Sequence, residues 1–320
     1  MSSDSMYVQP RNPEILGHPA GLFTASLPEG WTTASEFNTT SEAQSTFRNA
    51  EAQSVIEVRL IQAGENLQTA EEVSAYFNDT WLAASWREYT AWNERTRSTN
   101  DNKVMIDFSL RRGLVDYIAR HEAYSDGNWV YVTRVVTPAN ASGMLVYLLD
   151  QVSASLTPNN QFVGTPLNWK AYFDQTDKHI LRYPDGWTLT DAAAGVSASL
   201  ESDAGAVRLE AANAVVASES DAEAFVSASL PGASILSTEA IERNGFSGFS
   251  VAYSLPSADG PAFSGLAVLL NGPDERVHSA FLRSRLSGVD FNSDEAASIS
   301  GDLLQMMSTF TLLPDVGSNS

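Results

Sequence analysis

Two short stretches of this chain are nearly identical: "LPEGWT" at residues 27–32 and "YPDGWT" at residues 183–188. In each, proline presets one turn dihedral, glycine permits a positive φ, and a tryptophan follows directly. The two tryptophans, Trp31 and Trp187, are 156 positions apart (187 − 31). Large aromatic side chains at fixed positions beside a strand usually pack into a core. The repeated turn therefore predicts two similar domains, each with an interior anchored by its own tryptophan.

The likeness between the two halves continues after the turn. Val58–Leu60 reads Val-Arg-Leu and recurs as Val207–Leu209. A capping-box pattern, in which a hydroxyl residue is followed three positions later by Glu, begins a predicted helix at Thr69–Glu72 and again at Ser220–Glu223. The hairpin dipeptide Asp126-Gly127 likewise has a counterpart in Asn271-Gly272. We therefore expect both halves to have the same order of strands and helices.

Each half ends in a predicted amphipathic helix. The apolar stripe is formed by Leu145, Leu148, Leu149, Val152 and Leu156 in the first half, and by Ile299, Leu303, Met306, Met307 and Phe310 in the second. Strands joined by hairpin signals, with helices between and after them, favour an antiparallel sheet covered by helices. The predicted fold class is α+β: two tandem α/β/α sandwich domains, each an antiparallel sheet with helices packed on it.

The expected domain boundaries follow from the composition of the connecting segments. Residues 157–168 read "TPNNQFVGTPLN" and are rich in Pro, Asn and Gly, as linkers commonly are. We expect domain 1 at residues 19–158, a linker at 159–168 and domain 2 at 169–314. The ends of the chain, residues 1–18 and 315–320, are expected to be flexible tails.

The charge and composition of the chain exclude several classes of function. The 320 residues include 39 acidic and 19 basic ones, for a net charge of −20, so we expect no nucleic-acid partner. No cysteine is present, which excludes disulfides, zinc–thiolate sites, iron–sulfur clusters and thiol nucleophiles. No apolar run reaches the ~18–20 residues that cross a bilayer. Contact with a membrane is therefore expected only through a lipid anchor.

The histidines and acidic residues show no catalytic or metal-binding motif. His18 and His179 precede the two Trp turns at similar positions, which the fold or chance explains better than catalysis, and His121 and His278 complete the set. Asp290–Glu295, "DFNSDE", begins like a calcium loop but lacks its glycine, and a helix cap at Ser293 or Asp294 explains it more simply. We therefore predict no catalytic residue, no metal and no cofactor.

One stretch is unusually rich in aromatic residues. "WLAASWREYTAW", residues 81–92, contains Trp81, Trp86, Tyr89 and Trp92, whereas the matching region of the second half, "LPGASILSTEAI", has none. Trp81 fits the helical core stripe better than the other three do. Because Trp, Tyr and Arg are favoured at protein interfaces, we predict partner binding by Trp86, Tyr89 and Trp92, flanked by Arg111 and Arg112. Core packing is the alternative.

Several of these segments resemble the PsbP-like superfamily, which includes the PsbP extrinsic proteins of photosystem II, the Mog-type Ran-binding proteins and the bacterial DcrB-like proteins. The resemblance lies in the Pro-acid-Gly-Trp turn, in "NGF" at Asn244–Phe246 before a strand, and in the closing "STFTL" at Ser308–Leu312. The first half departs from it with Asn100-Asp101-Asn102 in place of the Gly-Phe. The resemblance implies an α/β/α sandwich that serves as an accessory or binding module. It transfers no functional residue.

Together these observations predict a non-catalytic, monomeric protein-binding or accessory protein made of two PsbP-like modules, with a partner that the sequence does not name. The Ser- and Asp-rich start, "MSSDSMYVQ", favours the mature form of an exported protein, periplasmic or on the cell surface, such as a lipoprotein. The alternative is a cytoplasmic DcrB-like chaperone that shelters apolar client segments on an exposed sheet face. A hydrolase or metal enzyme is the third candidate.

Overall fold

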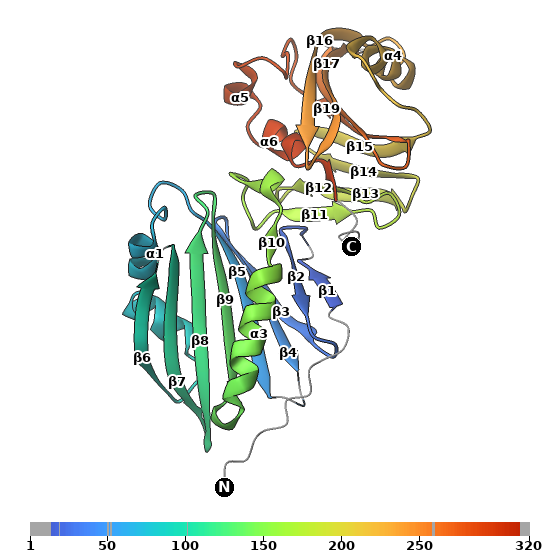
Figure 1. The fold of residues 1–320 in the computed structure, drawn as a ribbon. Helices are drawn as coiled ribbons and strands as arrows, with labels where there is room; N and C mark the ends of the chain where they lie inside the picture. The colour runs from blue at the N-terminus through green and yellow to red at the C-terminus, as the bar shows by residue number, and fades with distance from the viewer. Residues whose placement is uncertain are drawn as a thin grey trace. The chain divides into compact units, whose positions relative to one another are not determined.

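The computed structural model describes residues 14–18, 20–49, 51, 53–100, 102–257 and 260–313. They form two compact units (Figure 1). Unit 1 contains the described residues up to Asn159 together with Pro166–Asn168. Unit 2 contains Asn160–Thr165 and the described residues from Trp169 onward. The segment expected to be a linker is thus divided between the units, and two of its side chains, Phe162 and Leu167, are buried.

Unit 1 has a seven-stranded antiparallel sheet with the strand order β3-β4-β5-β9-β8-β7-β6, and a small sheet with the order β1-β2-β10. Its strands are β1 (Glu14–Gly17), β2 (Phe23–Leu27), β3 (Thr32–Asn38), β4 (Glu42–Asn49), β5 (Ser54–Gln62), β6 (Ala91–Asn100), β7 (Lys103–Arg112), β8 (Val115–Ser125), β9 (Trp129–Pro138) and β10 (Thr157–Pro158). Its helices are α1 (Ala70–Tyr76), α2 (Asp79–Ser85), α3 (Ser142–Ser155) and the short 3-10 helix η1 (Ala139–Ala141).

Unit 2 has the same arrangement. Its seven-stranded sheet has the order β13-β14-β15-β19-β18-β17-β16, and its small sheet has the order β11-β12-β20. The strands are β11 (Lys170–Phe173), β12 (His179–Tyr183), β13 (Thr188–Ala193), β14 (Ser197–Ser202), β15 (Gly205–Ala212), β16 (Ser234–Arg243), β17 (Phe246–Leu255), β18 (Phe263–Asn271), β19 (Val277–Ser284) and β20 (Thr311–Leu312). The helices are α4 (Glu219–Ser229), α5 (Ala296–Ile299), α6 (Asp302–Ser308) and η2 (Asn160–Phe162).

The two large sheets also agree in register. Each has an irregularity in its first pair of strands and another in its last pair, where a β-bulge shifts the pairing. One row of paired residues joins the two irregularities in each sheet. The row is Thr33, Phe47, Ile56, Val135, Arg120, Asp107 and Thr96 in unit 1. It is Leu189, Leu200, Val207, Leu282, Leu266, Ala252 and Ser237 in unit 2. Residues at the same place in these rows are called counterparts below.

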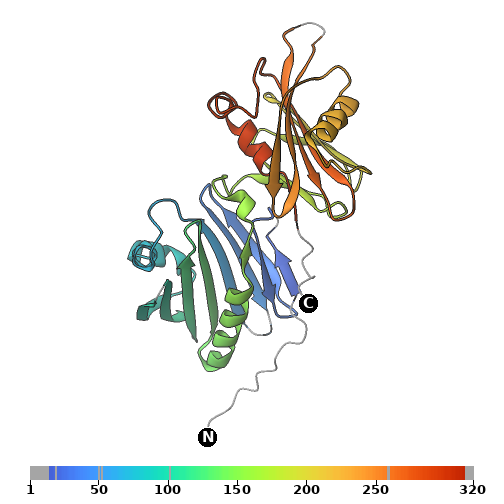
Figure 2. The same cartoon turned by 45° about the horizontal axis from the view of Figure 1, so that its top comes forward.

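Helices cover both faces of each large sheet, as Figures 1 and 2 show for α3 and α1 in unit 1. In unit 1, α1 and α2 pack on one face through residues such as Val73, Phe77 and Leu82. The apolar stripe of α3 is buried, as predicted. In unit 2, α4 packs against β16 and β17 on one face, while α6 closes the opposite core around Trp187. The predicted fold class, two antiparallel sheets each packed with helices, is confirmed.

Several details differ from the sequence expectation. Residues 14–17, assigned to the N-terminal tail, form β1 and pair with β2. Residues 1–13 and 314–320 lie outside the described part of the chain. The Val-Arg-Leu match is displaced by two positions, because the register makes Ile56, not Val58, the counterpart of Val207. A two-residue displacement leaves every side chain on the same face of its strand, so the apolar pattern could not reveal it.

Two helices of unit 2 also differ from the sequence expectation. The capping box at Thr69 and Glu72 is confirmed. In the second half the cap is Ser218, whose hydroxyl accepts from the amide of Asp221, so α4 begins before the predicted box at Ser220. The last helix of unit 2 is divided at Gly301, which has a positive φ of 52°, and Ile299 is therefore exposed instead of joining the buried stripe. Among the described residues, no helix is long and apolar enough to span a bilayer.

Candidate functional site

The structure brings the five predicted contact residues to one end of the large sheet of unit 1. Trp86 caps the end of α2, Trp92 lies in β6, and Arg111 and Arg112 end β7. The Tyr89 amide donates to the Trp86 carbonyl. The next residue, Thr90, donates to the Arg111 carbonyl through both its amide (2.8 Å) and its hydroxyl (2.9 Å). The loop after α2 is thereby fixed to the end of β7.

Trp86, however, does not face the solvent. Its side chain is 1% exposed and belongs to the core between α2 and the sheet. Its ring lies 4.9 Å from the ring of Phe108 and 4.3 Å from the guanidinium carbon of Arg134. The prediction that Trp86 contacts a partner directly is therefore wrong, and the alternative, packing in the core, describes this residue.

Tyr89 and Trp92 are half-buried and pack against the same core from its rim. The Tyr89 ring meets the rings of Trp86 and Tyr117 edge-on, at 5.7 Å and 5.9 Å between centroids. Trp92 lies opposite Leu110 in the β6–β7 pair, so its backbone is held by the sheet.

The sequence analysis missed the most exposed apolar side chain of this region. Leu114 is 93% exposed at the tip of the hairpin between β7 and β8, where Gly113 has a positive φ of 62°. Arg112 and Val115 close the turn as a pair, and Val115 is also exposed. We call this region the hairpin-tip surface; it consists of Tyr89, Trp92, Arg111, Arg112, Leu114 and Val115. "RRGLVD" reads as a turn, but nothing in it distinguishes a functional leucine from an ordinary one.

A buried ionic network supports the core beneath this surface. Glu57 in β5 accepts hydrogen bonds from Arg59 Nε (2.6 Å) and from Arg134, its cross-strand partner in β9. Arg59 also pairs with Glu42 and lies 4.8 Å from the Trp81 ring. Burial raises the pKa of Glu57, but the charges and hydrogen bonds of the two arginines outweigh it and keep the pKa below its ordinary value. The network therefore keeps Glu57 ionised under the tryptophans.

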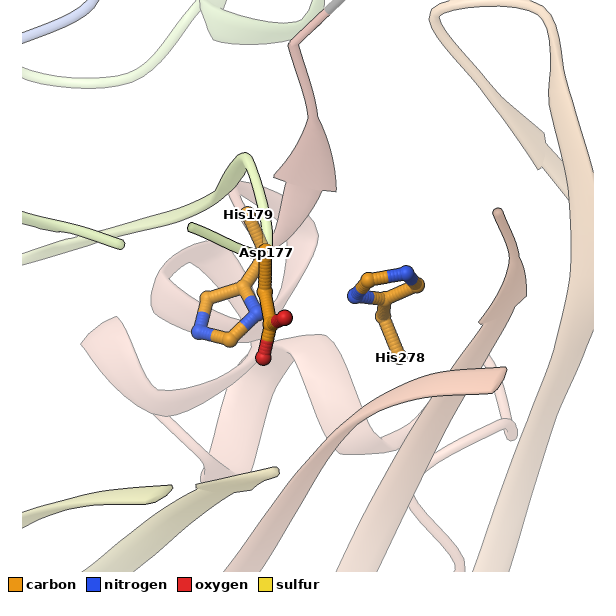
Figure 3. Close-up of side chains that lie close together, drawn as sticks. All are labelled: Asp177, His179 and His278. Carbon is orange, nitrogen blue, oxygen red and sulfur yellow. The ribbon is translucent and has the colours of Figure 1, made fainter. Parts of the chain in front are cut away.

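Unit 2 contains a second candidate site. Asp177, in the turn before β12, His179 at the start of β12 and His278 in β19 converge in the interior, with one potential ligand atom of each within 4.8 Å of the others (Figure 3). His179 is 2% exposed and His278 is 1% exposed. The cluster thus joins the small sheet to the large sheet of the unit.

Neighbouring charges hold two members of this cluster. Arg276 Nη1 donates to Asp177 Oδ1 at 2.6 Å, and His278 Nε2 lies 3.1 Å from Asp274 Oδ1. Among the described residues, Asp177 Oδ2, both ring nitrogens of His179 and Nδ1 of His278 have no hydrogen-bond partner. Burial lowers the pKa of His179 to about 4, with the Asp174 carboxylate opposing this shift. His179 is therefore neutral at pH 7.

The counterparts in unit 1 are not histidines. Counting back from the Pro-Gly-Trp turns places Phe23 opposite His179, and counting back from the Val135 and Leu282 pair places Tyr131 opposite His278. His18, expected at a position similar to that of His179, instead lies outside β2, with Nε2 3.1 Å from Asn38 Oδ1. Sequence reasoning missed the cluster because His179 and His278 are distant in the chain, and only the strand pairing brings them together.

Comparisons with known proteins find only distant structural similarity. No family model matches the chain, and no curated protein matches it. Among solved structures, the cyanobacterial PsbP (CyanoP) of Synechocystis sp. PCC 6803 aligns with 47% of this chain and 96% of its own, at 16% identity and a TM-score of 0.34. The immunity protein TplEi of the T6SS from Pseudomonas aeruginosa aligns with 93% of this chain and 97% of its own, at 10% identity and a TM-score of 0.26. At such values neither likeness carries a function over to this chain.

Proposed function

We propose that this protein is a non-catalytic accessory protein that binds another protein through the hairpin-tip surface of unit 1. The observation that carries the proposal is Leu114, which is almost fully exposed on a two-residue turn between two regular strands. Because Arg112 and Val115 pair across the turn, the backbone at Leu114 is already ordered, so a partner that covers this side chain does not have to order a loop as well. At the same end of the sheet are the half-buried Tyr89 and Trp92, residue types that dominate binding energy at protein interfaces.

The charge of the surface suggests the chemistry of the partner. Arg111 and Arg112 are exposed on a chain whose net charge is −20. Arg111 has a weak exposed pairing with Asp116 at 3.6 Å, which a partner carboxylate could replace at little cost. A partner segment with an apolar pocket for Leu114 and carboxylates for the arginines would be complementary. We therefore expect an acidic protein surface as the ligand.

The proposal includes the finer points of the sequence analysis. We infer that the two units descend from one duplicated PsbP-like domain, which the matching rows between the bulges support. We also infer a monomer that works outside the cytoplasm, periplasmic or on the cell surface, with a lipid anchor as its contact with the membrane. The strongly acidic composition fits an exported protein.

The chaperone alternative requires an extended apolar sheet face. Within the described residues, the exposed large apolar side chains are distributed over both units, as Phe37, Leu114, Val115, Val146, Val163, Phe173, Leu189, Val196, Val215, Leu236 and Ile299. Leu114 and Val115 are neighbours, but most of the others lie on separate elements. Exposed apolar residues on separate elements do not make up the continuous apolar face that a chaperone of this kind needs. We therefore favour a discrete contact over a sheltering sheet face.

The test is site-specific photo-crosslinking in the source cells. A photoreactive residue replaces Leu114 in one variant and Val196, an exposed residue of a tight turn in unit 2, in the control. Position 114 should give one discrete adduct that disappears when Arg112 is also changed to Glu, whereas position 196 should give none. No adduct at 114, or the same adducts at both positions, would contradict the proposal.

A further inference from the structure

Unit 2 buries more polar atoms around β12 than its own hydrogen bonds satisfy. Both ring nitrogens of His179, Nδ1 of His278 and Oδ2 of Asp177 lack partners among the described residues. Burying a polar group without a partner costs on the order of 1–3 kcal/mol, so native interiors rarely tolerate several of them in one place. The four atoms belong to three side chains that converge on one another (Figure 3).

The fold itself does not require histidine at these positions. In unit 1 the counterparts Phe23 and Tyr131 fill the corresponding space and are buried. Tyr131 satisfies its hydroxyl by donating to Asp126 Oδ2 at 2.6 Å. Unit 2 therefore has two imidazoles and a carboxylate where the same architecture is stable with an apolar ring and a phenol.

The residue types and their supports match a metal site. Imidazole nitrogen and carboxylate oxygen are ordinary ligands of Zn²⁺, at about 2.0–2.2 Å, so bound ligand atoms lie roughly 3–4 Å apart. The 4.8 Å limit on the present atoms leaves only a small contraction on binding. Metal-bound histidines commonly donate their other ring N–H to a carboxylate. His278 has this arrangement, because its Nε2 lies 3.1 Å from Asp274 Oδ1 while Nδ1 is free of hydrogen bonds.

The charges around the cluster also favour a cation. Asp174, Asp177 and Asp274 surround it, and Arg276 is the basic residue paired with Asp177 and Asp274. Asp174 uses both oxygens to accept hydrogen bonds, among them those from the amides of Asp177 and Gly195, so it stays in place behind the cluster. Arg276 occupies only Oδ1 of Asp177. One carboxylate oxygen is therefore left for a metal ion.

A surface depression lies beside the two residues that support the cluster. It is shallow and is lined by Asn213, Ala214, Val215, Asp274, Glu275 and Arg276. Asp274 and Arg276 are the residues that contact His278 and Asp177. A hydrated cation in the depression would therefore meet two carboxylates first and would reach the imidazoles after a rotation of the Arg276 side chain.

We propose that unit 2 binds one divalent transition-metal ion, Zn²⁺ or an ion of similar preference, through Asp177, His179 and His278. Three protein ligands leave a fourth position for water. Because His179 belongs to the small sheet and His278 to the large one, the ion would fasten the two sheets of unit 2 together.

The test uses the full chain and Zn²⁺ alone. Protein stripped with a chelator is titrated with Zn²⁺ by calorimetry, and bound metal is counted after dialysis. We expect one ion per chain and a rise in melting temperature on the order of 5 °C or more for unit 2 at saturating Zn²⁺. His179→Phe and His278→Tyr install the unit 1 residues, preserve side-chain bulk, and should each weaken binding by roughly 100-fold or more.

His121→Phe is the matched control, since His121 is another buried histidine with unpartnered ring nitrogens but lies in unit 1. It should bind Zn²⁺ as the unaltered protein does. Should either test variant misfold, the visible spectrum of the unaltered protein with Co²⁺ still decides, because a four-coordinate site with two imidazoles and a carboxylate gives visible bands far more intense than those of aqueous Co²⁺. Absence of these bands, absence of stoichiometric Zn²⁺, or unchanged binding in His179→Phe would each overturn the proposal.

Discussion

Units 1 and 2 share a strand order, a pair of bulges and a row of register between them, yet they fill equivalent interior positions with different chemistry. Glu57 and Arg134 form a buried ion pair across β5 and β9 in unit 1. Their counterparts in unit 2, Arg208 and Phe281, are also cross-strand partners, but they form a cation–π contact at 5.0 Å. The same backbone pairing thus supports two different interactions.

The difference arises from the cover above each sheet. In unit 1, α1 and α2 bury the ion pair under Trp81 and Trp86. In unit 2, α4 packs against β16 and β17, and the Arg208 side chain remains 42% exposed. A charge that keeps contact with water needs no buried counter-ion. The cover therefore decides whether this position requires a carboxylate.

The largest expected effect comes from Trp86→Ala. Removing a fully buried indole leaves a cavity, and we expect unit 1 to lose about 3–5 kcal/mol of its free energy of unfolding. Trp92→Ala, at the half-buried rim, should cost clearly less. Urea unfolding followed by circular dichroism measures both. Equal losses would show that the distinction drawn here between core and rim is wrong.

A somewhat smaller loss is expected for Glu57→Gln, which leaves Arg134 and Arg59 buried without their shared carboxylate. We expect about 3 kcal/mol of destabilisation, confined to unit 1. The control in unit 2 is Glu210→Gln, which breaks the partly exposed pair with Arg208 at 3.2 Å and should cost less than about 1 kcal/mol. Comparable losses of stability in both variants would contradict the conclusion that the helices covering the sheet of unit 1 make this ion pair necessary.

Acid should destabilise both units through their buried histidines. The pKa of His179 falls from 6.5 to about 4 on folding, mainly because of burial. The stability that the neutral imidazole provides is therefore complete above pH 6.5, and the free energy of unfolding falls as the pH drops from 6.5 towards 4. At pH 5 this loss is about 2 kcal/mol. Burial lowers the pKa of His121 in the same direction. The free energy of unfolding is measured at pH 7 and pH 5 in the presence of a chelator. His179→Phe should abolish the acid-induced loss of stability that His179 causes in unit 2, and His121→Phe should abolish the loss that His121 causes in unit 1.

The smallest effect on stability is expected at the hairpin tip. Leu114→Ser alters a side chain that is almost entirely in solvent, so the free energy of unfolding should change by less than about 0.5 kcal/mol. Capture of the partner should nevertheless be lost. Thermal unfolding and the crosslinking yield are measured on the same preparation, and a large drop in stability would show that Leu114 supports the fold.

Much of the architecture was predictable because local signals specify it. The Pro-Gly-Trp turns, the Thr69 capping box and the buried stripe of α3 each depend on residues close in sequence. The register of β5 and the division of the last helix at Gly301 were missed, since a shift by two keeps the apolar pattern and one glycine is a weak signal.

The sites were harder to predict. Trp86, Tyr89, Trp92, Arg111 and Arg112 do gather at one end of a sheet, but sequence does not tell which ring turns inward. The cluster of Asp177, His179 and His278 depends on the approach of β12 and β19, which no local pattern encodes. Long-range convergence of this kind emerges only when the sheets are placed.

The most direct test of the difference between the units is hydrogen exchange on the full chain, with and without Zn²⁺, followed by mass spectrometry. Binding at Asp177, His179 and His278 should slow exchange in the peptides that contain β12 and β19. The peptides of β2 and β9, which carry Phe23 and Tyr131 at the counterpart positions, should exchange at an unchanged rate. Protection that appears in both units alike, or in neither, would contradict the account.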